Sequence, residues 1–214
     1  MEKIPQPVIK RLCMIYQLLN EMLDKGHTTV SSSELGTRLG VGSHNVRKDI
    51  SCLDGVKSGG SGYDIVNLKN AIAHKFGFAD QKAACVVGLG RIGTAFLEHA
   101  HTVKSEFRIV AGFDSNTNRI ETIKTSVSVY PAYQISETAR KLNIQIAILT
   151  VPDTAAQDAA NRLIDGGVKG IINFTDTNLV IRKDDVFVKN MDVTGEMRML
   201  SALIRMDMNN SITM

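Results

Sequence analysis

The sequence predicts an α/β fold with a helical N-terminal domain, a doubly wound parallel-sheet domain and a C-terminal helix. Three observations predict this fold. Apolar residues recur at helical spacing over residues 1–78, and strand-like runs alternate with helical stretches over residues 79–192. In residues 193–214 apolar residues again recur at helical spacing, along one stripe. With 214 residues, of which 43% are hydrophobic, the chain is long enough for two small domains with cores of their own.

Several classes of protein are disfavoured by composition. No run of about 18 apolar residues occurs, so we expect no membrane span. The start, MEKIPQPVIKRL, lacks the apolar centre of a signal peptide. Cys13, Cys52 and Cys85 lie far apart and form no CxxC pair, which argues against a disulfide framework or a zinc site. We therefore expect no bound metal and a reducing, cytoplasmic environment.

The N-terminal domain begins with three predicted helices. Ile4-Pro5-Gln6-Pro7 is a helix start, and a first helix runs from Val8 to near Gly26. Serines before Glu34 provide N-cap residues for a short helix over residues 34–39. A turn with two glycines follows, and Ser43 is placed to cap a third helix over residues 43–53.

The second and third of these helices form a helix-turn-helix pattern. Its inner residues are expected to be Leu35, Leu39, Val41, Val46 and Ile50. The outer face of the third helix carries His44, Asn45, Arg47 and Lys48. Such side chains can bond base edges or phosphates in a major groove of double-stranded DNA, whereas two merely packed helices would need no such face.

Residues 54–66 predict a glycine-rich hairpin, the wing of a winged helix, and a helix over residues 67–76 closes the domain. Glycine lets backbone amides approach phosphates closely, and Lys57 and Tyr63 flank the glycines as further candidate DNA contacts. Charge supports this prediction. Residues 1–76 hold ten Lys and Arg against seven Asp and Glu, whereas residues 77–214 hold fifteen of each.

Beyond a boundary at residues 77–82 the pattern predicts a parallel sheet with helices on both faces. The expected strands are residues 84–87, 108–112, 144–151 and 170–174. The expected helices are residues 92–101, 135–142 and 154–166, followed by the C-terminal helix over residues 193–208. The apolar stripe of that last helix packs either on its own domain or on a second subunit.

The run VVGLGRIG at residues 86–93 contains the G-x-G-x-x-G pattern of dinucleotide-binding loops, Gly88-Leu89-Gly90-Arg91-Ile92-Gly93. Gly88 permits the turn, Gly90 lets a pyrophosphate approach, and Gly93 lets the helix pack on the strand. Asp114 ends the next strand, where a carboxylate accepts hydrogen bonds from a ribose and repels a 2′-phosphate. The pattern thus predicts NAD(H) binding, with NAD(H) favoured over NADP(H); a tight turn without a ligand is the alternative.

Two later loops follow expected strands, at the sheet edge where ligands bind. They are Thr150-Val151-Pro152 and Asn173-Phe174-Thr175, and either could contact the ribose or the nicotinamide. Pro152 and Phe174 could equally be packing residues.

No catalytic group accompanies the loop. His99 and His101 have no orienting carboxylate nearby in sequence, and too little chain remains for a substrate domain. We expect the nucleotide to act as a signal and the protein not to be an enzyme. Two alternatives stay open: a small NAD-dependent oxidoreductase, and a nucleotide-binding regulator that contacts protein rather than DNA.

The order of motifs resembles that of the Rex redox-sensing transcriptional repressors over nearly the whole chain. It reads IPxPVIKRL, SSxEL, VRKDIS, GxGYD, GLGRIG, FD, VP, GVKGIINF and a C-terminal helix. The resemblance implies a homodimer that exchanges its last helices, a two-fold symmetric DNA operator, and release of that operator when NADH replaces NAD+.

The resemblance also implies roles for individual residues. Arg11, Ser43, Asn45, Arg47 and Lys48 fall at DNA-facing or DNA-supporting positions. Gly88, Gly90, Gly93 and Asp114 match the nucleotide loop and the ribose acid. Asp192 matches an acid near the nicotinamide, and it would pair with Arg11 in one state of the switch.

The chain departs from the family pattern at three places. The wing lacks one arginine, Ser51-Cys52-Leu53-Asp54 replaces an aromatic S-Y-F-G, and His99 stands where a tyrosine is common. A pair between His99 and Asp192 would make the switch depend on pH. These changes indicate a divergent member or a paralogue.

Overall fold

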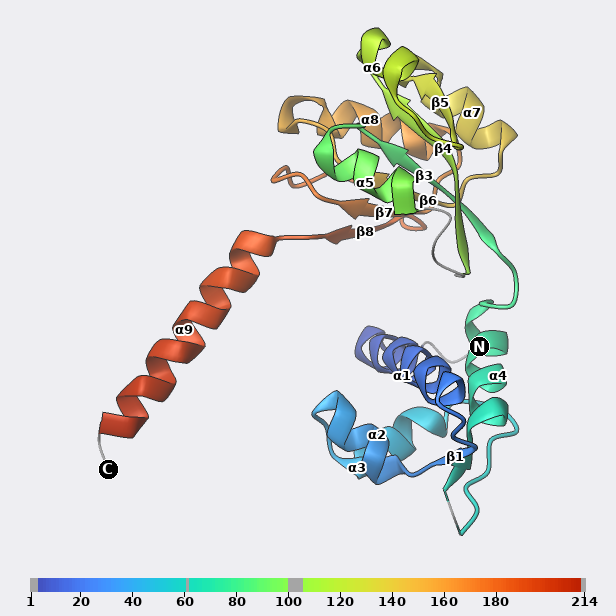
Figure 1. Ribbon diagram of the computed structural model, residues 1–214, viewed down its shortest axis with the longest axis vertical. Helices are drawn as coiled ribbons and strands as arrows, with labels where there is room; N and C mark the ends of the chain where they lie inside the picture. The colour runs from blue at the N-terminus through green and yellow to red at the C-terminus, as the bar shows by residue number, and fades with distance from the viewer. Residues whose placement is uncertain (1–3, 61, 100–105, 213–214) are drawn as a thin grey trace. The chain divides into compact units, whose positions relative to one another are not determined.

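The computed structural model describes residues 4–60, 62–99 and 106–212, which fold into two compact units (Figure 1). The units are Met1–Asp80 and Gln81–Met214. Each has its own hydrophobic core, and none of the described helices is long and apolar enough to span a membrane.

Four helices and one small antiparallel sheet form the N-terminal unit. The helices are α1 (Gln6–Asp24), α2 (Ser32–Leu39), α3 (Ser43–Ile50) and α4 (Ile65–Phe76), and the strands are β1 (Thr29–Val30) and β2 (Tyr63–Asp64). The side chain of Ser31 accepts a hydrogen bond from the Glu34 amide and so caps α2. Asp64 caps α4 in the same way. Gly40 ends α2 with φ +67°, a conformation that favours glycine.

The helix-turn-helix packs as predicted, with differences at its ends. Leu35, Val46 and Ile50 are buried, and Leu39 and Val41 pack against the same core. The predicted cap by Ser43 is wrong, because Gly42 is the N-cap residue of α3 and no side chain caps it. The helix also stops at Ile50, short of residue 53.

The segment predicted to form the wing pairs with itself only in part. Strand β2 pairs with β1, the strand that precedes α2, instead of with the first half of the glycine-rich segment. Within that segment, Gly59 and Gly62 form an isolated antiparallel bridge. The glycines therefore make a tight loop at the end of a short sheet.

A six-stranded parallel sheet forms the centre of the second unit, in the order β5-β4-β3-β6-β7-β8. The strands are β3 (Lys82–Val87), β4 (Phe107–Asp114), β5 (Ser128–Pro131), β6 (Ile146–Leu149), β7 (Gly170–Asn173) and β8 (Phe187–Asn190). The helices are α5 (Arg91–His99), α6 (Thr117–Thr122), α7 (Ile135–Lys141) and α8 (Asp153–Asp165), with a 3-10 turn at Ala132–Gln134.

Alternate residues of the central strands face different helices. In β3, Cys85 and Val87 belong to a large core that includes residues of α7 and α8. Val86 faces the other way, into a smaller core with Leu97 of α5. This is the doubly wound arrangement that the alternation of strands and helices predicts.

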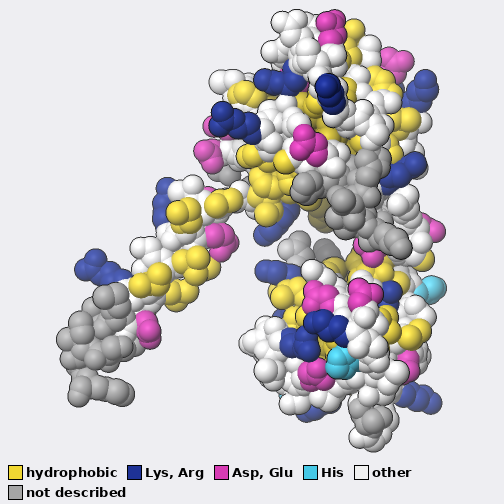
Figure 2. All heavy atoms as spheres, in the orientation of Figure 1, with side chains coloured by type: hydrophobic (Ala, Val, Ile, Leu, Met, Phe, Trp, Pro, Cys, Tyr) yellow, Lys and Arg dark blue, Asp and Glu magenta, His cyan; other side chains and the backbone are white. Residues whose placement is uncertain are grey.

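The chain ends in α9 (Val193–Ile212), which extends beyond the predicted end at residue 208. Its large apolar side chains are exposed, including Met197, Leu200 and Ile204 at 65%, 54% and 61%. In Figure 2, hydrophobic side chains gather on the half of this helix that follows β8.

Candidate functional site

The loop between β3 and α5 depends on two glycines. Gly88 has φ +90°, and a Cβ atom there would lie 2.6 Å from the carbonyl oxygen of Thr150. At Gly93, a Cβ atom would overlap the carbonyl oxygen of Gly88 and lie 2.8 Å from Thr150 Oγ1. The first turn of α5 thus packs directly against the loop and against the end of β6, as the glycine spacing predicts.

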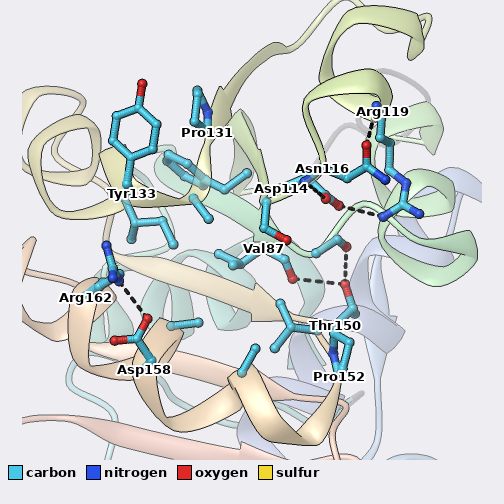
Figure 3. Close-up of a pocket in the computed structure, with 18 of the residues that line it drawn as sticks. Val87, Asp114, Asn116, Arg119, Pro131, Tyr133, Thr150, Pro152, Asp158 and Arg162 are labelled. Carbon is cyan, nitrogen blue, oxygen red and sulfur yellow. Dashed lines mark hydrogen bonds and ion pairs between the residues drawn. The ribbon is translucent and has the colours of Figure 1, made fainter.

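Gly90 differs from these two glycines, because no described atom beyond its two neighbours in the chain lies within 4 Å of the place where its Cβ would be. It opens onto a cleft of about 960 Å³ at the carboxyl ends of the strands, shown in Figure 3. The predicted residues Gly88, Thr150, Val151 and Pro152 line the same cleft. Open space at Gly90 is what the approach of a pyrophosphate requires.

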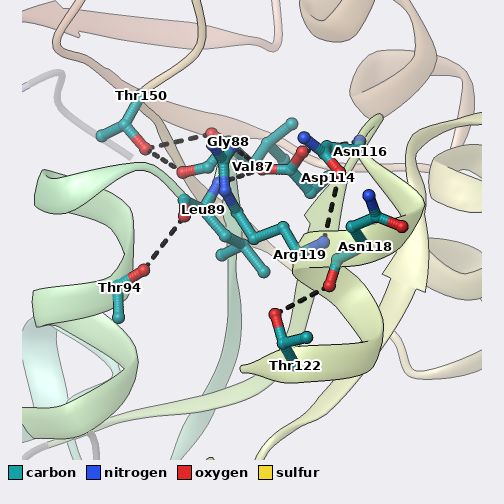
Figure 4. Close-up of polar contacts among 10 residues, drawn as sticks. All are labelled: Val87, Gly88, Leu89, Thr94, Asp114, Asn116, Asn118, Arg119, Thr122 and Thr150. Atoms are coloured by element: carbon teal, nitrogen blue, oxygen red, sulfur yellow. Dashed lines mark hydrogen bonds and ion pairs between the residues drawn. The ribbon is translucent and has the colours of Figure 1, made fainter. Parts of the chain in front are cut away.

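Asp114 stands at the end of β4, is 5% exposed and lines this cleft. Its carboxylate accepts hydrogen bonds from the amides of Leu89 (2.7 Å) and Asn116 (2.8 Å) and from Arg119 Nη1 (3.0 Å), as Figure 4 shows. Burial alone would raise the pKa of Asp114, but these three donors outweigh it and lower that pKa below its ordinary value. Asp114 is therefore ionised at neutral pH.

Arg119 is a residue of this site that the sequence did not reveal. It lies on α6, and its side chain is 44% exposed beside the nearly buried Asp114. The Asn116 side chain caps α6 by accepting a hydrogen bond from the Arg119 amide, which places the arginine one turn after the acid. No pattern in the sequence marks Arg119, because its contact with Asp114 forms only when α6 packs beside β4.

The Thr150 hydroxyl lies 2.6 Å from the carbonyl oxygen of Gly88, to which it donates, so it fastens β6 to the glycine loop. Asn173 holds the end of β7 to the loop that follows it and to β8, and its predicted contact with the cofactor stays a prediction. It is fully buried, and its amide group bonds Thr175, Thr177 and Asn190. Phe174 packs against Phe96 of α5 with ring centroids 5.6 Å apart.

The remaining predicted nucleotide residues lie outside the cleft lining. The Leu89 side chain is buried in the core, and Arg91 and Ile92 are exposed at the start of α5. Asp192 is exposed and its Oδ1 accepts a hydrogen bond from the Gly195 amide, so it caps α9. The side chain of His99, and the whole of His101, lie outside the described residues.

The cleft fits a dinucleotide such as NAD(H). A glycine faces open space where a pyrophosphate would approach, and an ionised acid ends the neighbouring strand. Apolar side chains make up much of the remaining lining, among them Val87, Phe113 and Pro131.

The second candidate site is the outer face of α3. His44, Asn45, Arg47 and Lys48 are all exposed there, as is Lys57 in the wing loop, and Ser43 is half-buried. Arg47 also donates a hydrogen bond to Ser32 Oγ at 3.1 Å. Tyr63, in contrast, is 6% exposed and packs in the core, and its predicted contact with DNA stays a prediction.

Arg11 lies behind this surface and ties α1 to α3. Its guanidinium makes two hydrogen bonds to Asp49, at 2.5 and 2.8 Å, and Asp49 is 2% exposed. The hydrogen bond to Asp49 raises the pKa of Arg11. In this structure the partner of Arg11 is thus a residue of its own unit instead of Asp192.

A winged-helix surface and a dinucleotide cleft in one chain define the class of nucleotide-responsive DNA-binding regulators. Residues 3–51 match the family model of a putative DNA-binding protein N-terminus, and residues 79–177 match that of a CoA-binding domain. The redox-sensing transcriptional repressor Rex 1 of Enterococcus faecalis is 33% identical over 204 residues, 95% of this chain and 94% of that protein. The chain belongs to the Rex family of redox-sensing transcriptional repressors.

Solved structures confirm the predicted fold class. The structure of RSP in complex with β-NAD+ and operator DNA has a TM-score of 0.86 and 27% identity, covering 100% of this chain and 98% of RSP. The structure of RSP with β-NADH has a TM-score of 0.85 and 25% identity over the full length of both chains.

Proposed function

We propose that this protein is a transcriptional repressor that senses the ratio of NADH to NAD+ and leaves its operator when NADH binds. The observation that supports the proposal is the presence of both candidate sites in one chain. The outer face of α3 exposes residues suited to a major groove, and the loop after β3 opens at Gly90 onto a cleft with an ionised acid. The related RSP structures hold operator DNA with NAD+ in one case and NADH in another.

On DNA, each exposed side chain of α3 has a chemistry suited to a different contact. Asn45 and Arg47 can make bidentate hydrogen bonds to adenine and guanine edges, whereas Lys48 and Lys57 offer point charges to phosphates. Arg47 is held by Ser32 at the start of α2, which limits the orientations of its guanidinium before DNA binds.

The two forms of the nucleotide differ by one positive charge on the nicotinamide ring. A dry apolar environment penalises a cation, so such a pocket favours NADH. The ligand shifts the protein only if it binds two dimer shapes with different affinity. We propose that NADH changes the distance between the two recognition helices of a dimer, which must match the spacing of half-sites on DNA.

The nucleotide acts as a signal in this proposal. The two carboxylates that line the cleft are each paired with an arginine: Asp114 with Arg119 at 3.0 Å and Asp158 with Arg162 at 2.8 Å. Because its hydrogen bonds lower the pKa of Asp114, this carboxylate is a weak base toward the hydroxyl proton of an alcohol. We expect no turnover with NAD+ and a panel of alcohols and hydroxy acids.

We further propose that α9 forms a homodimer. Its exposed apolar residues include Met197, Leu200 and Ile204, three to four positions apart on one stripe. Seven large apolar side chains between Val193 and Met206 are more than half exposed, and a monomer rarely leaves such a surface in water. Two-fold pairing of this helix would cover it in both copies.

The dimer is tested by Leu200→Glu. We expect the variant to behave as a monomer, or to dimerise at least about tenfold more weakly, because a carboxylate would enter an apolar interface. Light scattering after size-exclusion chromatography measures the mass. Glu196→Gln, on the same helix, serves as the control that keeps the dimer. A monomeric wild-type protein would reject this part of the proposal.

DNA recognition is tested by replacing Arg47 and Lys48 together with alanine. We expect operator affinity to fall at least about tenfold and the salt dependence to become shallower, because two cations leave the interface. Fluorescence anisotropy at several salt concentrations measures both quantities. Lys25→Ala, an exposed lysine at the end of α1, is the matched control and should change neither.

The same assay tests sensing at fixed salt. NADH should release the operator and NAD+ should not. Equal affinity with and without saturating NADH contradicts a redox sensor. Intact function in the Arg47 and Lys48 double variant would instead indicate a regulator that contacts protein.

A further inference from the structure

The ion pair between Asp114 and Arg119 changes what the ribose acid can do. A carboxylate offers about four acceptor positions. Three are taken, by the amides of Leu89 and Asn116 and by Arg119 Nη1. About one position remains for a ribose, which has two hydroxyl groups to place there.

The charge of the site is changed as well. An unpaired aspartate at this position repels a 2′-phosphate, which is the usual basis for selecting NAD(H). Here the negative charge of Asp114 is compensated by a guanidinium at 3.0 Å. The net charge that a 2′-phosphate meets at this point is therefore close to zero instead of −1.

Arg119 also has donors left over for a ligand. A guanidinium carries five N–H groups in a planar fork suited to phosphate, and the side chain of Arg119 is 44% exposed. It lines the same cleft as Asp114, together with the polar residues Ser115 and Asn116 of the loop between β4 and α6 and with Thr117 at the start of α6. In Figure 4 its side chain extends from α6 toward Asp114, beneath the glycine loop.

We infer that Arg119 sets the discrimination between NAD(H) and NADP(H) in this cleft and allows the phosphorylated dinucleotide to bind. NAD(H) stays the preferred ligand because Asp114 keeps an acceptor for a ribose hydroxyl. The penalty for a 2′-phosphate is reduced because an arginine stands beside the acid. The inference rests on the proposed function in one respect, that the cleft binds NADH.

The test compares the binding of NADH and NADPH to the full-length protein, using the fluorescence of the reduced nicotinamide itself. In the wild type, we expect NADPH to bind no more than roughly 100-fold more weakly than NADH. Arg119→Ala should weaken NADPH relative to NADH by at least about tenfold further, because the acid is then unopposed. Asp114→Asn should shift the ratio in the opposite direction.

Two further variants separate charge from structure. Arg119→Lys keeps the charge without the fork and should retain part of the NADPH affinity. Lys124→Ala removes an exposed cation that follows α6 and lines neither cleft that Arg119 lines, so it should leave the ratio unchanged. A merely structural role for Arg119 would weaken NADH and NADPH by the same factor.

The outcomes are distinct. A wild type that binds NADH but shows no NADPH binding at 100-fold higher concentration overturns the inference and leaves the proposed function intact. An unchanged ratio in Arg119→Ala also overturns it. Absence of NADH binding to the wild type would overturn both.

Discussion

Replacing Gly93 with alanine is expected to abolish nucleotide binding and to destabilise the second unit by about 3 kcal/mol, the upper end of the usual cost of overpacking. The added methyl group would overlap the carbonyl oxygen of Gly88 and lie 2.8 Å from Thr150 Oγ1. Both neighbours are held: Gly88 by its turn at φ +90°, and Thr150 by donating to that same carbonyl. The start of α5 must therefore move away from the loop.

Gly90→Ala is the informative comparison. No described atom beyond its two neighbours in the chain lies within 4 Å of its Cβ position, so the fold should keep its stability. The methyl group would instead occupy the space at which a pyrophosphate approaches, and NADH affinity should fall by at least about tenfold. Calorimetry and NADH fluorescence measure the two effects. A stable Gly93→Ala variant, or a Gly90→Ala variant with unchanged affinity, would contradict this account of the loop.

The glycine loop could be predicted because its residues act through the backbone. The turn requires Gly88, and the close contact between helix and strand requires Gly93. Asp114 ends the next strand, where dinucleotide-binding folds place an acid. Arg119 escaped prediction because its role depends on a side chain returning from α6 to the end of β4. The burial of Asn173 could not be predicted, because position at a strand end does not tell whether a side chain points into a cleft or into the protein.

Elements at the edges of the fold were also missed. Strands β5 and β8 lie at the two edges of the sheet, and each has only four residues. β5 reads Ser-Val-Tyr-Pro and β8 reads Phe-Val-Lys-Asn, so neither strand carries the continuous apolar run that identifies a buried parallel strand. The exposed face of α3 was correctly predicted because its amphipathic pattern is local.

The pair between Arg11 and Asp49 could not be read from the sequence, since 38 positions separate the two residues. Because Asp49 is 2% exposed and Arg11 is 28% exposed, the two partners are not equivalent. Removing the arginine leaves a buried carboxylate without a counter-charge, whereas removing the acid leaves a guanidinium that water can reach. The buried Asp49 thus holds α3 against α1 through its ion pair with Arg11.

We therefore expect Arg11→Met to destabilise the N-terminal unit by about 3 kcal/mol and Asp49→Asn to cost less, on the order of 1–2 kcal/mol. The double variant should cost less than the sum of the single variants, because no unpaired charge remains in it. Calorimetry of the full-length protein, with hydrogen exchange of the α1 and α3 amides, measures these costs. Lys10→Met, an exposed neighbour on α1, is the control.

The same variants decide what Arg11 contributes to DNA binding. If its role is to hold α3, operator affinity should fall in Arg11→Met in step with stability, and the salt dependence should stay close to that of the wild type. If Arg11 contacts phosphate directly, the salt dependence should become shallower, as it does when an interface cation is removed. The pairing of its charge with Asp49 favours the first result. An Arg11→Met variant as stable as Lys10→Met would show that the pair does not position the recognition helix.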